Sequence, residues 1–408
     1  MCSPCSAPPR PFAGPSRLLA GKGSSAGCAT ELRALGVSPA HGAVLLVVDD
    51  VVMKLELHRP AWSSLLGAGF TVLIGPGVAA EPTPETVRTL LPESADEIAA
   101  VVAVGGGSAL DAAKLVSVAL TNPLDLTAGL SSTADIVPGP PIVAVPTTAG
   151  TGAEVTAVAM LWHSHRKRMF VHPHLVPRVV LIDPELLLRL PPSVTASGGF
   201  DAIGHAAESL LSTFRTPVTA AAAREALALL SRSLPAAYAA GDLDSRYGTA
   251  LGAYHAGLAL NASVVLGHSL AYVIAARTGL PHGASVAMAL PYCLAHARPA
   301  CEGQIADMAA IVCGEPDAEL FVRWIVEHSQ RMRIPTSLAE LGVDRNELAA
   351  MAADCVDSYP RSNHPVRVDA AGVLALLERL HAGEPYAAWH DTAWHDSSRH
   401  EIDSEAHT

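Results

Sequence analysis

The apolar residues of the first half of the chain gather in short continuous runs that recur along the sequence. Five such runs stand out, at 43–48, 70–74, 99–104, 141–146 and 178–183. A continuous apolar run of this length is typical of a strand buried on both faces of a sheet. Helical segments are predicted between several of the runs, at 83–91 and 109–120. Strands that alternate with helices in this way predict a parallel, doubly wound α/β sheet.

The pattern changes in the second half of the chain. From residue 193 to about residue 383, strand-like runs give way to Ala- and Leu-rich helical periodicity, broken by loops such as those at Gly241 and Gly279. We therefore predict an α/β domain over residues 16–190 and an all-α domain over residues 191–385. Residues 1–15, rich in Pro and Ser, are predicted to be a disordered tail, and the polar residues 386–408 a flexible one.

One stretch of the helical half, from Tyr247 to Ala276, contains no charged side chain. It is long enough to span a bilayer, but its histidines, polar side chains and glycines favour a buried helix pair. The N-terminal residues contain no apolar segment of the kind that signal peptides use. We therefore expect a cytoplasmic protein with no membrane partner.

Composition and charge narrow the class of protein further. Half of the residues are hydrophobic and 16% are charged, which excludes intrinsic disorder for most of the chain. The formal net charge is −12 and no basic stripe is visible, so we expect no nucleic-acid partner. The seven cysteines are scattered; only Cys2 and Cys5 form a Cys-x-x-Cys, without a second pair that would complete a zinc site.

Two polar loops directly follow predicted strands. The first is Gly105-Gly-Gly-Ser-Ala-Leu-Asp-Ala-Ala-Lys114, between a strand and a helix. Its glycines allow the backbone to approach a pyrophosphate, and the helix N-terminus offers free N–H groups. The second is Pro146-Thr-Thr-Ala-Gly-Thr-Gly-Ala-Glu-Val-Thr156, which carries four hydroxyls. Ligands of open α/β sheets lie at the carboxyl ends of strands, so both loops are candidates for a nucleotide site, with a packing turn and polar capping as alternatives.

Asp49 closes the first apolar run. An acidic side chain at this place can hydrogen-bond a ribose diol and repel a 2′-phosphate, which favours NAD over NADP. The alternative is an ordinary turn at the end of a strand, because Asp49 and Asp50 together are a common way to open a loop.

Four residues of the helical half form a candidate metal-binding set. Asp201 and His205 are four residues apart, a spacing that puts both side chains on one face of a helix. His268 and His282 lie further along, also in very apolar surroundings. Three imidazoles and one carboxylate suit a divalent metal with an open position for substrate, and Fe²⁺, Zn²⁺, Mn²⁺ and Ni²⁺ all fit these ligands. Because the chain has 18 histidines, each of them alone is better explained as structural.

Five motifs occur in order, within a resemblance that runs from about residue 11 to residue 383: Gly-Gly-Gly-Ser-x-x-Asp-x-x-Lys, Pro-Thr-Thr-x-Gly-Thr-Gly-x-Glu-x-Thr, Asp-Pro-Glu-Leu, Gly-x-Asp-Ala-x-x-His-Ala-x-Glu-Ser and a late Pro-His-Gly. On these motifs the chain resembles the iron-dependent (group III) alcohol dehydrogenases. The resemblance implies an α/β N-terminal dinucleotide-binding domain with a parallel sheet, an all-α C-terminal metal-binding domain and a cleft between them. We also expect a homodimer or a larger homo-oligomer.

The resemblance also implies roles for individual residues. The metal ligands would be Asp201, His205, His268 and His282. The cofactor would meet Gly106, Gly107 and Ser108 at its pyrophosphate, with Asp111 nearby, Thr147, Thr148 and Thr151 on the nicotinamide side, and Lys167 at the ribose. The implied cofactors are Fe²⁺, with Zn²⁺ as second candidate, and NAD(H) in preference to NADP(H).

The chain departs from the family pattern at two places. Many members carry a second histidine four residues after the third ligand, often assigned to proton relay, and here that position is Tyr272. This looks closer to branches that handle acid or phosphonate aldehydes, including hydroxyacid–oxoacid transhydrogenase and phosphonoacetaldehyde reductase. The family's late Asn-Pro-Arg stands here as Tyr359-Pro-Arg361.

The expected activity is reversible hydride transfer between a nicotinamide cofactor and an aldehyde/primary alcohol pair, with the metal as Lewis acid. Tyr272, a ribose hydroxyl or a water chain would supply the proton. Alternatives are a hydroxyacid–oxoacid transhydrogenase, a lyase like dehydroquinate synthase, which usually carries Glu in place of Asp201, and a non-catalytic nucleotide-binding relative.

The Tyr272 pattern also suggests a small anionic aldehyde, such as phosphonoacetaldehyde, as substrate. The negative net charge disfavours anions at long range, so such a substrate needs a local cation. Arg277, between two predicted ligands, and Arg361 are the candidates, because a guanidinium can bind a carboxylate or phosphonate through two parallel hydrogen bonds. A solvated charge or an ordinary ion pair is the alternative for each.

Overall fold

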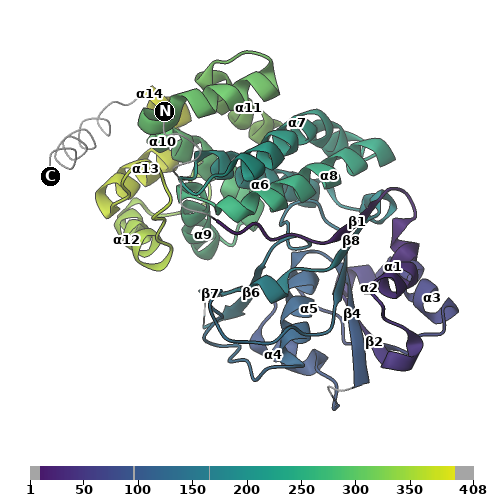
Figure 1. Cartoon of the computed structure of the whole chain (residues 1–408). Helices are drawn as coiled ribbons and strands as arrows, with labels where there is room; N and C mark the ends of the chain where they lie inside the picture. Colours follow the sequence, from purple (N-terminus) through teal and green to yellow (C-terminus); the bar gives the residue numbers. More distant parts are fainter. Residues whose placement is uncertain (1–9, 95–96, 165, 391–408) are drawn as a thin grey trace. The chain divides into compact units, whose positions relative to one another are not determined.

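The computed structural model describes residues 10–94, 97–164 and 166–390 (Figure 1). Contacts divide these residues into two compact units. The sheet unit comprises residues 11–190 and 241–258, and the helical unit comprises residue 10, residues 191–240 and the described residues from 259 onward. The predicted C-terminal tail starts too early, because Pro385–His390 form helix α14, in which Ala388 and Trp389 are buried. Residues 1–9 and 391–408 lie outside the described part.

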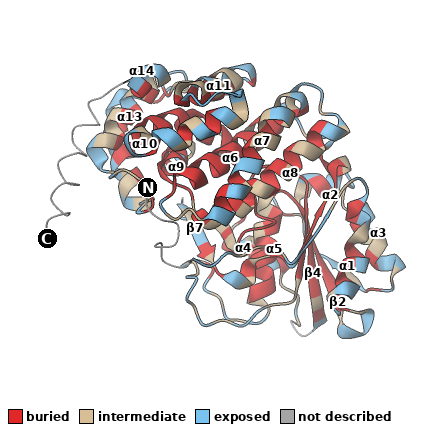
Figure 2. Cartoon of the chain, turned by 45° about the horizontal axis from the view of Figure 1, so that its top comes forward, coloured by how far each residue is buried: buried red, intermediate tan, exposed pale blue. Residues whose placement is uncertain are grey.

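The sheet unit is built on six parallel strands in the order β1-β8-β5-β4-β2-β3. The bounds are β1 Arg17–Ala20, β2 Ala43–Val48, β3 Val72–Ile74, β4 Ile98–Gly105, β5 Ile142–Pro146 and β8 Val179–Ile182. All five predicted strands are present, within one or two residues at each end. Every residue of β2, β5 and β8 is buried, which explains their continuous apolar sequences (Figure 2).

The strand order reverses between β2 and β4. From β2 the chain moves outward to β3, and then returns to the other side of β2 to form β4. In open α/β sheets, such a reversal leaves a crevice at the carboxyl ends of the two strands, where ligands bind. The residues that follow β2 and β4 are therefore placed where a ligand of this sheet is expected.

Three strands were missed in the sequence. β1 is a short edge strand, and its Leu18 and Leu19 are exposed, so it lacks the apolar run that marks the central strands. β6 (Val158–His163) and β7 (Arg166–Val171) form a separate antiparallel pair. β7 begins with Arg166, Lys167 and Arg168 and so gives no continuous apolar run, whereas β6 lies in the apolar residues 157–162, which were not predicted as a strand.

Helices complete the sheet unit. They are α1 Cys28–Ala34, α2 Asp50–Lys54, α3 Arg59–Gly67, α4 Pro84–Leu90, α5 Gly107–Ala119 and α8 Leu243–Ala259. Although α8 was predicted with the all-α region 191–385, its contacts group residues 241–258 with the sheet unit. Arg246 of α8, for example, donates a hydrogen bond to the Leu190 carbonyl at 2.9 Å.

The helical unit contains no strand among its described residues, as predicted. Its helices are α6 Pro192–Leu211, α7 Pro217–Ala239, α9 Leu266–Thr278, α10 His282–Cys313, α11 Ala318–Arg331, α12 Leu348–Ser358, α13 Ala370–Ala382 and α14 Pro385–His390. α10 contains Pro291 and Pro299 and has non-helical backbone angles at Cys301, where it kinks. Buried residues recur in α11 at helical spacing, so one of its faces is buried and the other exposed (Figure 2).

The uncharged stretch 247–276 folds into two helices, parts of α8 and α9, as the sequence indicated. Among the described residues, no single helix is long and apolar enough to cross a membrane. α8 and α9 pass that test only as a pair, by length and composition, and the pair is bent by 110°.

Candidate functional site

The candidate metal cluster begins on helix α6. Asp201 and His205 lie one turn apart on its buried face, with side chains 5% and 7% exposed. The apolar, Ala- and Gly-containing sequence of α6 buries fifteen of its twenty residues, so both polar side chains sit deep in the helical unit. The i, i+4 spacing predicted from the sequence therefore holds in the structure.

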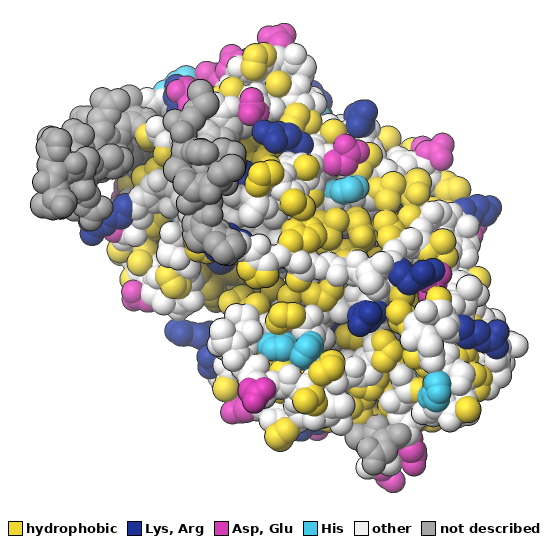
Figure 3. Space-filling model, in the orientation of Figure 1, with side chains coloured by type: hydrophobic (Ala, Val, Ile, Leu, Met, Phe, Trp, Pro, Cys, Tyr) yellow, Lys and Arg dark blue, Asp and Glu magenta, His cyan; other side chains and the backbone are white. Residues whose placement is uncertain are grey.

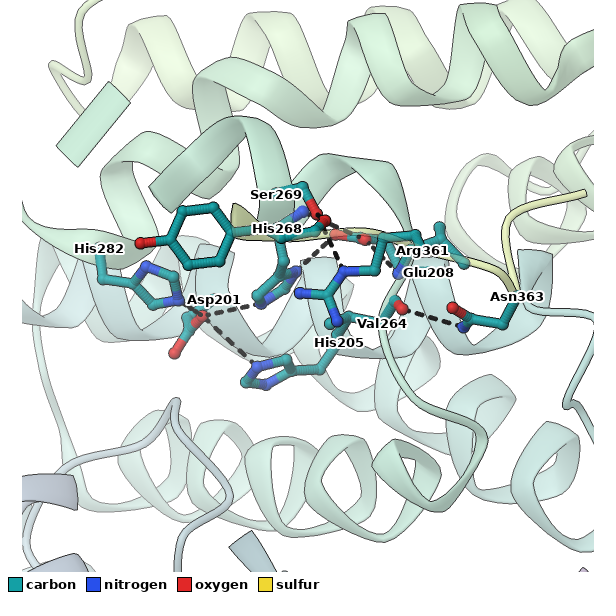
Figure 4. A network of polar contacts seen from close by, with 11 residues as sticks. Asp201, His205, Glu208, Val264, His268, Ser269, His282, Arg361 and Asn363 are labelled. Carbon is teal, nitrogen blue, oxygen red and sulfur yellow. Dashed lines mark hydrogen bonds and ion pairs between the residues drawn. The ribbon is translucent and has the colours of Figure 1, made fainter. Parts of the chain in front are cut away.

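Two further histidines reach the same carboxylate from other helices (Figure 4). His268 comes from α9, and His282 is the first residue of α10. The Nε2 atoms of His205, His268 and His282 lie 3.6, 3.5 and 3.6 Å from Asp201 Oδ1. The structure thus brings together all four residues that the sequence singled out. His282 is the most open of the three imidazoles, with 25% of its side chain exposed.

The geometry of this cluster fits a divalent metal ion. Asp201, His205 and His268 form a buried group whose ligand atoms all lie within 4.8 Å of one another. Two ligands that each lie about 2.1 Å from an ion at tetrahedral angles are about 3.4 Å apart, close to the separations seen here. Asp201 Oδ1 and His268 Nε2 are buried and have no hydrogen-bond partner among the described residues. An ion would satisfy both atoms.

The electrostatics of the cluster favour a cation as well. Burial raises the pKa of Asp201, but the neighbouring imidazoles outweigh this and hold the pKa well below its usual range. Burial lowers the pKa of His268, but the carboxylates of Glu208 and Asp201 raise it to about 10. The site therefore stabilises a positive charge at His268 Nε2, which either a proton or a metal ion can supply.

Glu208 is a site residue whose role the sequence did not reveal. It is fully buried, and its Oε1 accepts a 2.6 Å hydrogen bond from His268 Nδ1. Its Oε2 accepts hydrogen bonds from the backbone N–H groups of Val265 and His268. With Nδ1 as the donor, the lone pair of His268 is on Nε2, which faces Asp201. A carboxylate behind a histidine is a common way to orient a metal ligand.

Aromatic rings adjoin the cluster. The Tyr272 ring stacks on the His282 ring, with 5.1 Å between centroids, and lies 4.8 Å from the Tyr359 ring. Tyr272 is therefore next to a candidate ligand, as its sequence position implied.

The two arginines predicted at the substrate end have different surroundings. Arg277 makes a two-pronged ion pair with Glu347 on the surface. This is the ordinary ion pair that the sequence left open as an alternative, so the structure gives no support to an anion site at Arg277. Arg361 instead donates from Nε to the Ser269 hydroxyl at 2.9 Å, beside ligand His268 (Figure 4).

In the sheet unit, several of the predicted cofactor residues lie at or next to the strand-order reversal. Asp49 follows β2, and its backbone N–H donates to Val104 O of β4. Cβ atoms added at Gly106 and Gly107 would lie 3.3 Å from Thr148 and 2.9 Å from Thr151. The two glycine- and threonine-containing loops are thus in contact, and a side chain at Gly107 would collide with the second loop. Thr147 is buried, and its N–H donates to Gly105 O.

The N-terminus of α5 fits an anion. Its N-cap is Gly106, which provides no capping side chain, and the helix is 13 residues long. The first N–H groups of α5, at Gly107 and Ser108, are therefore free of side-chain caps, and the helix dipole favours negative charge there. Asp49, in contrast, uses Oδ1 to cap α2, accepting from the N–H groups of Val51 and Val52.

Asp111 and Lys114 explain why the first loop motif continues into α5. The fully buried Lys114 donates to Thr156 Oγ1 and Val158 O and lies 3.5 Å from Asp111 Oδ1, while Asp111 Oδ2 accepts from Met160 N–H. The pair ties α5 to β6 and to the end of the threonine loop, a structural role that the sequence did not indicate. Burial raises the pKa of Asp111, and the positive charges of Lys114 and of Lys167, on β7, oppose this shift. Lys167 Nζ also lies 3.8 Å from Glu81 Oε1.

These observations define a class of protein. It has an α/β unit whose strand order reverses where such sheets bind ligands, and a helical unit with a buried cluster of three histidines and one carboxylate. Comparison with known families is consistent with this class. The model of the iron-containing alcohol dehydrogenase family matches residues 15–184, and that of the Fe-containing alcohol dehydrogenase C-terminal domain matches residues 195–381. The chain belongs to the iron-containing alcohol dehydrogenase family. It is therefore an oxidoreductase that acts on alcohols or aldehydes.

Individual proteins of this family are similar to the chain over most of its length. The chain is 33% identical to long-chain-alcohol dehydrogenase 1 of Geobacillus thermodenitrificans over 85% of its length and 92% of the relative. It is 30% identical to the NAD-dependent methanol dehydrogenase of Bacillus methanolicus, over 85% and 94%. The crystal structure of a 1,3-propanediol oxidoreductase, 30% identical, superimposes with a TM-score of 0.85 over 91% of this chain and all of that one.

Proposed function

We propose that the protein catalyses reversible hydride transfer between NAD(H) and a small aldehyde/primary alcohol pair, at an iron ion held by four side chains. Those side chains are Asp201, His205, His268 and His282. The observation that carries the proposal is the convergence of three imidazole Nε2 atoms on Asp201 Oδ1 at 3.5–3.6 Å in a buried site. NAD is favoured because a relative identical at 30% of positions is named an NAD-dependent dehydrogenase.

When bound, the ion supplies a Lewis acid for the substrate oxygen, and the nicotinamide supplies the hydride. The contribution of this chain is to hold the ligands in place. Glu208 fixes the ring and the proton of His268, and burial of the cluster keeps water from competing for the ligand atoms. Zn²⁺ is the second candidate metal, because the same ligands suit it.

In the sheet unit, we assign the pyrophosphate to the N-terminus of α5, at Gly106, Gly107 and Ser108. The uncapped N–H groups and the close backbone approach of this loop support the assignment. The hydroxyls of Thr147, Thr148 and Thr151 are assigned to the nicotinamide side, and Lys167 and Asp49 to the riboses. Asp111, which the sequence placed near the cofactor, is assigned to positioning the loop through Lys114.

We assign the proton of the substrate oxygen to the hydroxyl of Tyr272, because its ring stacks on the His282 ring at the open side of the cluster. A cofactor ribose hydroxyl and a water chain are the other routes. Membership of a phosphonoacetaldehyde reductase-like branch, a cytoplasmic location and homo-oligomer formation stay predictions. A transhydrogenase or a lyase is not favoured, since the relatives quoted above are named as alcohol dehydrogenases or oxidoreductases.

The proposal is tested with His268→Ala and, as control, His390→Ala, an exposed histidine of the same unit. Protein prepared without oxygen is analysed for iron and zinc, and NADH consumption is measured over a panel of small aldehydes. We expect the His268 variant to lose both metal and activity, and the His390 variant to keep both. Full metal content with near-normal kcat in His268→Ala would refute the site.

A further inference from the structure

The segment that follows helix α12 is fixed against α6 and α9, two of the three helices that carry the metal cluster. Asn363 donates to Ser212 Oγ, at the end of α6, and to Val264 O, just before α9. At the other end of the segment, the carbonyl of Tyr359 accepts a 2.7 Å hydrogen bond from the Ser269 hydroxyl of α9. The backbone between these anchors forms a turn, with His364 N–H bonded to Arg361 O. Arg361 thus lies in a segment held at both ends.

The guanidinium of Arg361 is oriented by one hydrogen bond. Its Nε donates to Ser269 Oγ at 2.9 Å, and the same hydroxyl donates to Tyr359 O, so the donor and acceptor roles of Ser269 are both used. Ser269 directly follows the ligand His268 in sequence. In Figure 4 the guanidinium projects toward His268 and His205. The fork formed by Nη1 and Nη2 is therefore presented on the side of the metal cluster.

Arg361 has no carboxylate partner among the described residues, although it is partly buried. Several other arginines in the helical unit are paired with carboxylates: Arg277 with Glu347, Arg298 with Glu302 and Arg331 with Glu327. A partly buried guanidinium without a counter-ion is costly unless an anion joins it. A guanidinium whose Nε is already bonded still offers two N–H groups in one plane, which match a carboxylate, phosphonate or sulfonate.

The charges around Arg361 lead to the same conclusion. Two carboxylates, Asp201 and Glu208, lie in the cluster, and a divalent ion there would balance them. Arg361 then adds one positive charge that no described side chain neutralises. A substrate with a negatively charged end would neutralise it.

We propose that Arg361, held by Ser269, binds the terminal anion of the substrate, so that the preferred substrates are short aldehydes ending in a carboxylate, phosphonate or sulfonate. This inference rests on the proposed function of the neighbouring cluster. In this proposal Ser269 positions Arg361, and Arg277 does not take part in substrate binding. Neutral aldehydes remain substrates, but without the contribution of this contact.

The test compares aldehydes of the same shape that differ in charge. 4-Oxobutanoate is paired with 4-methylpentanal, and phosphonoacetaldehyde with 3,3-dimethylbutanal. Each is assayed with the wild type, with Arg361→Met and with the control Arg331→Met, an exposed arginine of α11. We expect the wild type to favour both anions and Arg361→Met to lose about tenfold or more in kcat/KM for the anions only, as expected for loss of a charge-assisted contact. Arg331→Met should match the wild type.

Binding is measured separately, without turnover. Calorimetric titration of the metal-loaded protein with 4-hydroxybutanoate and with neutral 4-methylpentan-1-ol gives two dissociation constants for each variant. Arg361→Met should weaken binding of the anion only, by about tenfold or more. Arg361→Lys should recover part of this loss, because lysine keeps the charge but lacks the two parallel N–H groups. Ser269→Ala should weaken binding of the anion and leave binding of the neutral alcohol unchanged. Metal content and unfolding temperature confirm that each variant is folded.

The outcomes distinguish failure of the anion site at Arg361 from failure of the proposed dehydrogenase activity. Equal use of anions and neutral aldehydes by the wild type, or equal losses for both in Arg361→Met, overturns the anion site. If no aldehyde of either kind is reduced, the proposed activity fails, and the titrations still decide whether Arg361 binds the anion.

Discussion

At the scale of single residues, Glu208 shows how the cluster is prepared for a metal by a side chain that lies behind one of the ligands. Its two oxygens accept from His268 Nδ1 and from two backbone N–H groups, so a negative charge is fully hydrogen-bonded behind the ligand. Such a carboxylate fixes the ring of the histidine and makes it a stronger ligand.

We predict that Glu208→Gln weakens metal binding about 10- to 100-fold. The amide keeps the shape but loses the charge, and it turns an N–H group toward one of the donors that Glu208 now accepts from. Competition against a chelator of known affinity measures the effect. Glu302→Gln, which removes an exposed carboxylate from α10, is the control. An unchanged metal affinity in Glu208→Gln would mean that this carboxylate only packs the core.

Site residues could be predicted from the sequence only where their spacing is local or where several residues of the same kind could be considered together. Asp201 and His205 share a helix face through their spacing, and the other two histidines gained weight only together with them. Glu208 could not be assigned, because its partner is 60 positions away. The ion pair of Arg277 spans 70 positions, so nothing near Arg277 in the sequence reveals that its charge is already matched.

At the scale of secondary-structure elements, the ends of β2 and β4 and the starts of α2 and α5 set the environment of the proposed cofactor. Asp49 has two tasks there, because it caps α2 and also lies at the strand reversal. A substitution that tests its charge must therefore leave the cap in place.

We predict that NADH is preferred over NADPH and that Asp49→Asn reduces the difference in kcat/KM between the two cofactors. Asparagine is as good a helix cap as aspartate, so the change removes the charge that would repel a 2′-phosphate and keeps α2 intact. The ratio of kcat/KM for the two cofactors is the measurement. Asp50→Asn, at a neighbouring carboxylate paired with Lys54, should leave the ratio unchanged. A wild type that favours NADPH would contradict the assignment.

Helices α6 and α10 approach closely at the cluster. A Cβ atom at Gly283 would lie 1.9 Å from Ser197 O and 2.9 Å from Asp201 Cβ, so a side chain there would force the two helices apart. We predict that Gly283→Ala costs about 1–3 kcal/mol or more of stability and loosens the metal site.

Gly303→Ala is the matched control for that substitution, because it lies on the same helix with nothing within 4 Å of the added Cβ. It should stabilise the protein by up to about 1 kcal/mol, since alanine is the better helix former. Urea unfolding midpoints and metal content of both variants are compared. Equal stability of the two variants would show that α6 and α10 are not in close contact at Gly283.

The central strands, α4, α5 and the helical character of the second half could be predicted, because burial on both faces and helical periodicity leave local patterns. β1 could not, since it is an exposed edge strand whose partner is distant in sequence. β6 and β7 pair with each other across a short connection, but the pair is only partly buried and β7 begins with charged residues, so it does not show the pattern of the central strands. β1 pairs with β8, some 160 positions further on. The grouping of α8 with the sheet unit was missed for the same reason.

At the scale of the whole molecule, the proposed chemistry is divided between two separately packed units. The metal ligands all belong to the helical unit, and the assigned cofactor residues all belong to the sheet unit. On the face drawn in Figure 3, basic side chains are interspersed with acidic and apolar ones.

We predict that the two ligands protect different units from hydrogen exchange. Adding Fe²⁺ or Zn²⁺ to metal-free protein should slow exchange in α6, α9 and the start of α10 and raise the unfolding temperature, because an ion that binds only the folded state stabilises it. NADH alone should slow exchange around residues 105–111 and 147–151. Protection of the sheet unit by the metal alone would contradict the assignment.

Neither unit is one continuous piece of chain, and this affects how the protein can be made. The sheet unit needs residues 11–190 and also α8, whose Arg246 bonds to Leu190 O, while residues 191–240 between them belong to the other unit. During synthesis, a nascent chain that has emerged to residue 190 still lacks α8, and at about 5–20 residues per second that helix follows only seconds later. In that interval the apolar surface that α8 covers stays open, so a chaperone has a site to bind on the incomplete sheet unit.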